Sequence, residues 1–127
     1  MKETPGLELL VDDDGEGRAA ADGDTLVFNM RVFLNRGDEV PLNEQQAAQL
    51  PASMIRTVAG RALVDHTLVL GKRRAIAGVE HALYGMKAGG HRRVRISPHL
   101  AYREHGVPGL IPGNAVLEVE LWLRELR

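Results

Sequence analysis

A chain of 127 residues, of which 44% are hydrophobic and 26% charged, has the size and composition of one globular domain. It contains no cysteine, which excludes disulfides and thiolate chemistry and would leave a zinc site only histidine and carboxylate ligands. The N-terminus lacks the features of a signal peptide, and no apolar run is long enough to span a membrane, so we expect a cytoplasmic protein.

The net charge of −1 hides an uneven distribution along the chain. Residues 1–24 contain eight acids and two bases, a balance of −6, whereas residues 72–95 contain seven bases and one acid, a balance of +6. The basic segment is compatible with an acidic partner or nucleic acid, or with charges that simply face the solvent. The small net charge favours the solvated alternative, because nucleic-acid-binding domains usually carry excess positive charge.

The first part of the chain predicts two β-strands. Alternating apolar residues over 7–11 indicate a short edge strand within an N-terminal extension, residues 1–22, and the acidic run with glycine at 12–15 indicates a turn after it. Residues 25–34 are rich in β-branched and aromatic side chains, which is typical of a strand. The residues at 35–38 are those that favour a closing turn.

Residues 41–66 are the least strand-like part of the sequence. Asn43 is placed to cap a short helix, with Gln46 three residues later as in a capping box. Pro51 would interrupt that helix, and residues 53–58 are expected to form a second helical turn.

A longer helix is predicted over residues 72–87, after a short apolar run at 68–71. Lys87 would complement the negative end of the helix dipole, and glycines at 89–90 would end the helix. Spacings of three and four place one set of apolar residues on a single helical face. These are Ile76, Val79, Ala82, Leu83 and Met86.

The last part predicts two further strands joined by a long loop. Residues 91–97 and 115–123 alternate between apolar and polar side chains, which indicates a sheet with one face in water. The loop at 97–114 is longer than most connections, and ordered loops of this length on a rigid scaffold often carry function.

From residue 70 to residue 123 the sequence resembles the FKBP family, the macrolide-binding peptidyl-prolyl isomerases. Gly23-Asp24-Thr25, which precedes the predicted strand at 25–34, is similar to the start of the family's central strand. The resemblance covers residues 23–40 and 66–127, whereas 41–65 looks like an insertion. The residues that carry it are Leu70-Gly71, Ile76, Gly78, Glu80, Met86, Gly89, Ile96-Ser97-Pro98, Ala101-Tyr102, Gly106-Val107-Pro108, Ile111-Pro112, Asn114-Ala115, Leu117 and Val119-Glu120-Leu121.

The resemblance implies a single α+β domain over residues 1–127, in which a strongly bent antiparallel sheet wraps around one amphipathic helix. It implies a peptidyl-prolyl isomerase without a cofactor, acting on proline-containing peptides or unfolded proteins. Tyr102 would offer its hydroxyl and Ile76 its backbone N–H to the substrate, and Ile111 would form an apolar wall. The other expected substrate-binding residues are Met30, Val40, Ala75, Val79 and Val119.

Several pocket aromatics of the family are replaced in this chain. Val79 stands where the family usually has the tryptophan of the pocket floor, and Met30 replaces an aromatic residue of the central strand. We therefore expect a wider pocket, weak macrolide binding and reduced turnover, because aromatic rings offer large, rigid apolar contacts. The remaining replacements are Val40-Pro41 for an aromatic–acid pair, His66 or Leu68 for the aromatic before the Leu-Gly motif, and Val119 in the last strand.

These losses leave alternatives open. The first is an isomerase with weak activity, and the second is a binding or chaperone-like module of the same fold. A third and more remote possibility is a module that binds nucleic acid through residues 72–95. We expect no metal site, since the histidines form neither an HxH nor an HExxH motif. They are His66, His81, His91, His99 and His105.

Overall fold

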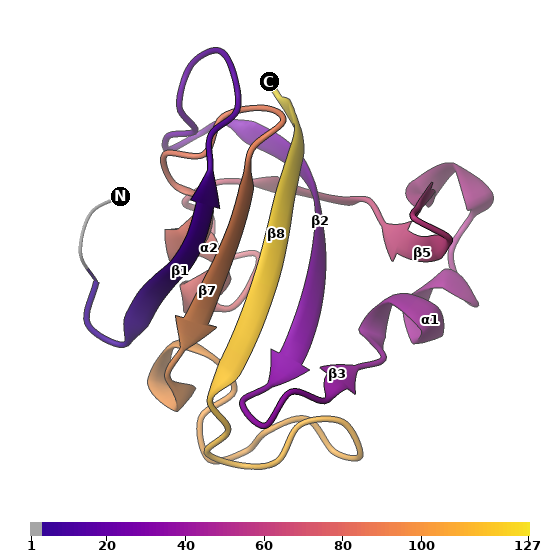
Figure 1. Cartoon of the computed structure of the whole chain (residues 1–127), viewed down its shortest axis with the longest axis vertical. Coiled ribbons are helices and arrows are strands. Elements are labelled where there is room, and N and C mark those ends of the chain that lie inside the picture. Colours follow the sequence, from indigo (N-terminus) through magenta and orange to yellow (C-terminus); the bar gives the residue numbers. More distant parts are fainter. Residues whose placement is uncertain (1–3) are drawn as a thin grey trace.

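The computed structural model describes residues 4–127 and combines a large antiparallel sheet, a separate hairpin and short helices (Figure 1). Within that range no helix is both long and apolar enough to cross a membrane. The strands are β1 (Leu7–Asp13), β2 (Thr25–Leu34), β3 (Glu39–Val40), β4 (Ile55–Val58), β5 (Arg61–Val64), β6 (His66–Val69), β7 (His91–Ile96) and β8 (Leu117–Leu126). The helices are α1 (Leu42–Ala47), α2 (Ala77–Leu83) and the 3-10 helices η1 (Ala52–Met54) and η2 (Pro98–Leu100).

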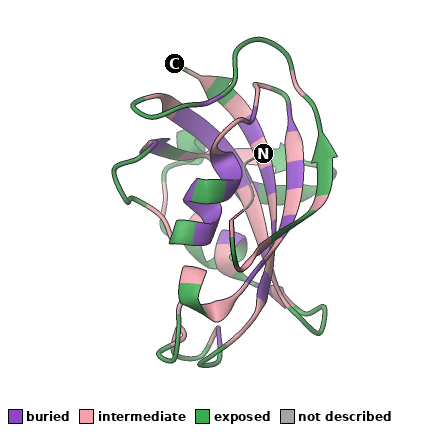
Figure 2. Cartoon of the chain, turned by 90° about the vertical axis from the view of Figure 1, so that its left-hand side faces the viewer, coloured by how far each residue is buried: buried purple, intermediate pink, exposed green. Residues whose placement is uncertain are grey.

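Five strands of the main sheet lie in the order β1-β7-β8-β2-β3, and β6 pairs with the first half of β2. Neighbouring strands are antiparallel, and β2 pairs with β8 from Leu26–Leu126 to Leu34–Leu117. The sheet bends around α2, which packs against the face of β7 and β8 (Figures 1 and 2). This arrangement confirms the predicted fold class, and the edge position of β1 confirms the prediction for the first strand.

Alternation along the strands produces the core. In β7 and β8 every second side chain is buried against α2, as the sequence pattern predicted. Each apolar side chain buried in this way contributes about 1.5–3 kcal/mol relative to an exposed one. The β7 and β8 residues that are at most 1% exposed are Val94, Ile96, Leu117, Val119, Leu121 and Leu123.

The helix predicted over residues 72–87 is shorter in the structure, because α2 contains only Ala77–Leu83. A turn precedes it, in which Arg73 has a φ of +55°. Gly85, with a φ of +82°, ends it before the predicted glycine pair, and Lys87 lies outside the helix. The Gly85 N–H donates to a loop carbonyl at 2.9 Å instead of continuing the helix. A local turn at the N-terminal end and a tertiary hydrogen bond at the C-terminal end therefore override the apolar periodicity.

Part of the uneven charge of the sequence is paired within the fold, since acidic β1 lies beside basic β7. The predicted turn at residues 12–15 was wrong in its first half, because Asp12 and Asp13 belong to β1 and pair with β7. The ion pairs across this boundary are Arg92–Asp12 at 3.0 Å and Arg95–Glu8 at 2.8 Å, and His91 Nδ1 lies 3.1 Å from a carboxylate oxygen of Asp13.

Residues 41–65, for which the sequence predicted an insertion and which are called the insertion lobe below, form α1, η1 and the β4–β5 hairpin (Figure 1). The helical turn predicted at 53–58 is present only as η1, which ends at Met54. From Ile55 the prediction was wrong, because the β-branched residues of β4 pair with β5 through a two-residue hairpin turn. Ala59 and Gly60 both have positive φ, at 50° and 78°, which matches the turn that joins tightly paired antiparallel strands.

Asn43 does not cap α1, as its predicted role required. It lies inside the helix, 7% exposed, and Pro41 occupies the capping position without a side-chain hydrogen bond. The Asn43 amide instead donates to the Met30 carbonyl at 2.8 Å and accepts from the Val64 N–H at 2.9 Å. The Asn43 side chain thereby joins α1 to both β2 and β5, and it provides hydrogen-bond partners for one backbone carbonyl and one backbone N–H.

Candidate functional site

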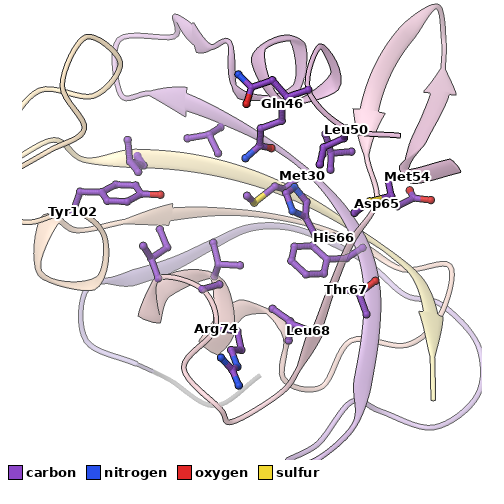
Figure 3. A pocket seen from close by; sticks show the side chains of 18 residues that line it. Met30, Gln46, Leu50, Met54, Asp65, His66, Thr67, Leu68, Arg74 and Tyr102 are labelled. Carbon is purple, nitrogen blue, oxygen red and sulfur yellow. The ribbon is translucent and has the colours of Figure 1, made fainter. Parts of the chain in front are cut away.

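A cavity of about 530 Å³ lies between the insertion lobe, β2, β6 and the start of α2 (Figure 3). Its size falls in the range of sites for drug-sized ligands, about 300–1,000 Å³. The buried side chains of Phe28, Val32, Val79 and Leu117 line it, so its inner surface is mainly apolar. A surface of this kind excludes water from a bound apolar group.

The structure brings five of the eight predicted site residues to this cavity, and their roles there stay predictions. They are Met30, Ala75, Ile76, Val79 and Tyr102. The other three, Val40, Ile111 and Val119, do not line it. They are 4%, 4% and 0% exposed and belong to the same apolar core. Any influence of these three on a ligand would pass through the side chains packed in front of them.

Tyr102 follows η2 and directs its hydroxyl into the cavity (Figure 3). The ring is partly buried, and this burial raises the pKa of Tyr102, so the hydroxyl is a protonated donor at neutral pH. No hydrogen bond joins it to another group among residues 4–127. The loop is fixed beneath it, because the Gly106 N–H donates to the Tyr102 carbonyl at 3.1 Å. The hydroxyl is therefore available to a ligand.

Ile76 stands at the N-terminal end of α2 in an extended conformation. The turn before it is held by the buried carboxylate of Glu80, which accepts from the N–H groups of Gly71 at 3.1 Å and Ala75 at 3.4 Å. These two bonds use the neighbouring donors, and the Ile76 N–H has no acceptor within the described part of the chain. A free donor thus lies at the edge of the apolar cavity, as the predicted role of Ile76 requires.

His66 and Leu68 both line the cavity, so both positions considered for the lost aromatic face it. The His66 ring stacks on Phe28 with a centroid distance of 5.3 Å and an angle of 28°. Burial lowers the pKa of His66, although the neighbouring carboxylate of Asp65 opposes this effect. At neutral pH the ring is uncharged, and it completes an aromatic wall together with Phe28.

This lowered pKa predicts a pH dependence of stability. Folding disfavours protonation of His66, so the unfolded chain binds more protons below its ordinary pKa of 6.5. The free energy of unfolding should therefore fall as the pH decreases from 6.5 towards the folded-state pKa, and should level off below that pKa because both states are then protonated. His66→Phe should flatten that slope in urea unfolding measured between pH 5.5 and 7.5. Equal slopes in wild type and His66→Phe would contradict the assignment.

One wall of the cavity comes from the insertion lobe, which sequence reasoning did not connect with the site. The sequence does not indicate this contact, because the hydrogen-bonded residues Asn29 and Asp65 are 36 positions apart. Only the hairpin pattern around Ala59-Gly60 could have indicated that residues 41–65 form an ordered element. The lobe residues that line the cavity are Gln46, Gln49, Leu50, Met54, Val64 and Asp65.

Asp65 is already engaged within the protein. Its carboxylate accepts from Arg56 Nε at 3.0 Å and from Asn29 Nδ2 at 2.7 Å. Burial alone would raise the pKa of Asp65, but the hydrogen bonds from Arg56 and Asn29 hold it below the usual value. The group is thus an ionised, fixed part of the wall. In the described residues, no cluster of three or more histidine or acidic side chains has a metal-binding arrangement.

Comparison with known proteins identifies one family and several relatives whose names agree with it. The family model described as "FKBP-type peptidyl-prolyl cis-trans isomerase" matches residues 16–123. "FK506-binding protein 4" of Chaetomium thermophilum is 44% identical over 113 residues, covering 89% of this chain and 20% of that protein. "FK506-binding protein 4" of Emericella nidulans is 34% identical over 129 residues, covering 100% of this chain and 23% of that protein.

The chain thus spans about a quarter or less of the length of these two relatives. A shorter relative, "FK506-binding protein 1A" of Neurospora crassa, is 28% identical over 116 residues, which cover 91% of this chain and 83% of that protein. The family match includes β2, α2, β7 and most of β8, and it contains the loop that carries Tyr102. By this match, the chain belongs to the FKBP-type peptidyl-prolyl cis-trans isomerase family.

Proposed function

We propose that this chain is a peptidyl-prolyl cis-trans isomerase that acts on X–Pro bonds of peptides and unfolded proteins without a cofactor. One observation carries the proposal. An apolar cavity brings together the free hydroxyl of Tyr102, the free N–H of Ile76 and the buried floor residue Val79. Membership of the family supports the same activity.

The reaction needs only this kind of site. Rotation about an X–Pro bond breaks amide resonance, against a barrier of about 18–20 kcal/mol, and no covalent bond is made or broken. A catalyst must bind the twisted amide more tightly than the planar one. The apolar cavity favours the less polar twisted form, while Tyr102 and Ile76 can donate hydrogen bonds to substrate carbonyl groups.

The floor determines how strongly the prolyl ring is held. Val79 is 1% exposed and packed in the core, and it presents fewer apolar atoms to the cavity than a tryptophan ring would. Met30, which also lines the cavity, likewise places a flexible side chain where the resemblance predicts a rigid aromatic ring. Weak binding of macrolide inhibitors and modest turnover are therefore part of the proposal.

A second candidate function is a peptide-binding or chaperone-like module with little isomerase activity. The specific observation in its favour is exposed apolar surface on the insertion lobe, where Met54 is 39% and Val58 is 37% exposed. Such surface next to an apolar cavity suits the capture of unfolded segments. Binding without acceleration of X–Pro exchange would distinguish this function from the first.

Tyr102→Phe provides the direct test. NMR exchange on a set of X–Pro peptides should show acceleration by the wild type, and the variant should lose roughly two- to tenfold in kcat/KM, as expected for one lost hydrogen bond. Tyr84→Phe is the matched control, because the Tyr84 hydroxyl bonds Asp22 and Tyr84 does not line the cavity that contains Tyr102. Its kcat/KM should equal that of the wild type.

Two results would point away from this mechanism. If Tyr102→Phe matches the wild type, the hydroxyl has no part in catalysis. If the folded wild type binds peptides without accelerating exchange, the second function applies. In that case Val79→Trp, which restores an aromatic floor at the cavity, should make activity detectable.

A further inference from the structure

The insertion lobe forms the side of the cavity that lies opposite Tyr102. Figure 3 shows Gln46, Leu50 and Met54 on one side and the Tyr102 hydroxyl pointing inward from the other. A prolyl ring placed between Tyr102 and Val79 would leave the lobe side of this cavity of about 530 Å³ unfilled. The lobe therefore faces whatever part of the substrate adjoins the proline.

The lobe surface is held rigidly by buried polar contacts. Asn29, which is fully buried, donates to the Val64 carbonyl at 2.7 Å and accepts from Arg124 Nε at 2.6 Å. Asn43 links α1 to β2 and β5, as described above. Side chains presented from a fixed frame bind with a smaller loss of conformational entropy.

The chemistry of this surface suits a peptide chain. Gln46 and Gln49 are exposed at the cavity edge, and their amides form no hydrogen bond within the described residues. Each primary amide offers both a donor and an acceptor, the pair of groups that a peptide backbone presents in return. Leu50 and Met54 supply an apolar surface beside them, and the flexible methionine adapts to different side chains.

We propose that the insertion lobe is a second substrate subsite that holds an extended segment next to the proline. Gln46 and Gln49 bind the backbone of that segment, and Leu50 and Met54 bind one of its apolar side chains. The inference rests on the proposed function. Binding energy gained at the lobe compensates for the missing aromatic floor, and it lowers the isomerisation barrier where it positions the twisted amide.

The test compares a capped four-residue X–Pro peptide with peptides lengthened by four residues at either end, each extension carrying a leucine. Lengthening at one end should raise kcat/KM of the wild type. The double variant Gln46→Ala/Gln49→Ala should lower kcat/KM for that long peptide roughly tenfold, about the effect of two modest hydrogen bonds, and leave the short peptide unchanged. Gln45→Ala is the matched control, since Gln45 is exposed on the same helix but does not line the cavity.

Equal rates for short and long peptides in the wild type, or equal losses in Gln45→Ala and the double variant, would overturn the subsite. A wild type that accelerates no peptide would refute the proposed function instead. The subsite would then be judged by NMR titration with the long peptide. Weaker affinity in the double variant alone would support it, and unchanged affinity would overturn it.

Discussion

Replacement of Arg92 by methionine is expected to lower the free energy of unfolding by about 2–5 kcal/mol. Arg92 is 5% exposed, and its guanidinium joins three elements. It bonds Asp12 of β1 at 3.0 Å and donates to the carbonyls of Ala82 at 2.9 Å and Tyr84 at 2.7 Å. These carbonyls belong to the C-terminal end of α2, where no intrahelical donor remains. Methionine keeps the apolar stem but leaves both carbonyls unsatisfied.

Urea unfolding followed by circular dichroism measures this loss. Arg36→Met is the control, because the Arg36 side chain is 74% exposed and pairs with Asp38, which is 62% exposed. Such surface changes usually alter stability by no more than about 0.5 kcal/mol. A loss below about 1 kcal/mol in Arg92→Met would show that water replaces the guanidinium at the helix end, and would contradict its role as a cap.

The strands could be predicted from the sequence because burial in a sheet repeats every two residues. Leu117, Val119, Leu121 and Leu123 alternate with polar side chains, and the structure buries all four. Helix ends could not be predicted in the same way. The C-terminal limit of α2 depends on the Ala20 carbonyl, which receives the Gly85 N–H and is distant in sequence, and its N-terminal limit depends on the positive φ of Arg73, which apolar periodicity does not indicate.

The candidate site was predictable only in part for a similar reason. Tyr102 and Ile76 lie in segments that match the family, so their positions could be inferred from the resemblance. The lobe wall depends on contacts between distant segments, such as Asn43 with Met30 and Val64. A polar residue near a helix start is usually a cap, and only the fold shows that Asn43 faces inward.

The second large effect concerns Gly106, which shapes the loop that presents Tyr102. Gly106 has a φ of +60°, and its N–H donates to the Tyr102 carbonyl at 3.1 Å. A Cβ here would press against the Ile111 carbonyl oxygen and lie 2.7 Å from that of Pro112, so the backbone must shift. Gly106→Ala should lower kcat/KM about 10- to 100-fold, because misplacement of a catalytic group by about 1 Å can cost this much.

Gly109→Ala in the same loop separates the clash from the backbone strain. Gly109 also has a positive φ, +77°, but no heavy atom of residues 4–127 outside its immediate chain neighbours lies within 4 Å of the position that an alanine methyl group would take there. Both variants therefore carry a left-handed alanine, at a cost of about 1–2 kcal/mol each, and only Gly106→Ala adds the collision. NMR exchange should show kcat/KM of Gly109→Ala within about twofold of the wild type. Equal activity losses in the two variants would mean that loop strain, and not the position of Tyr102, controls the rate.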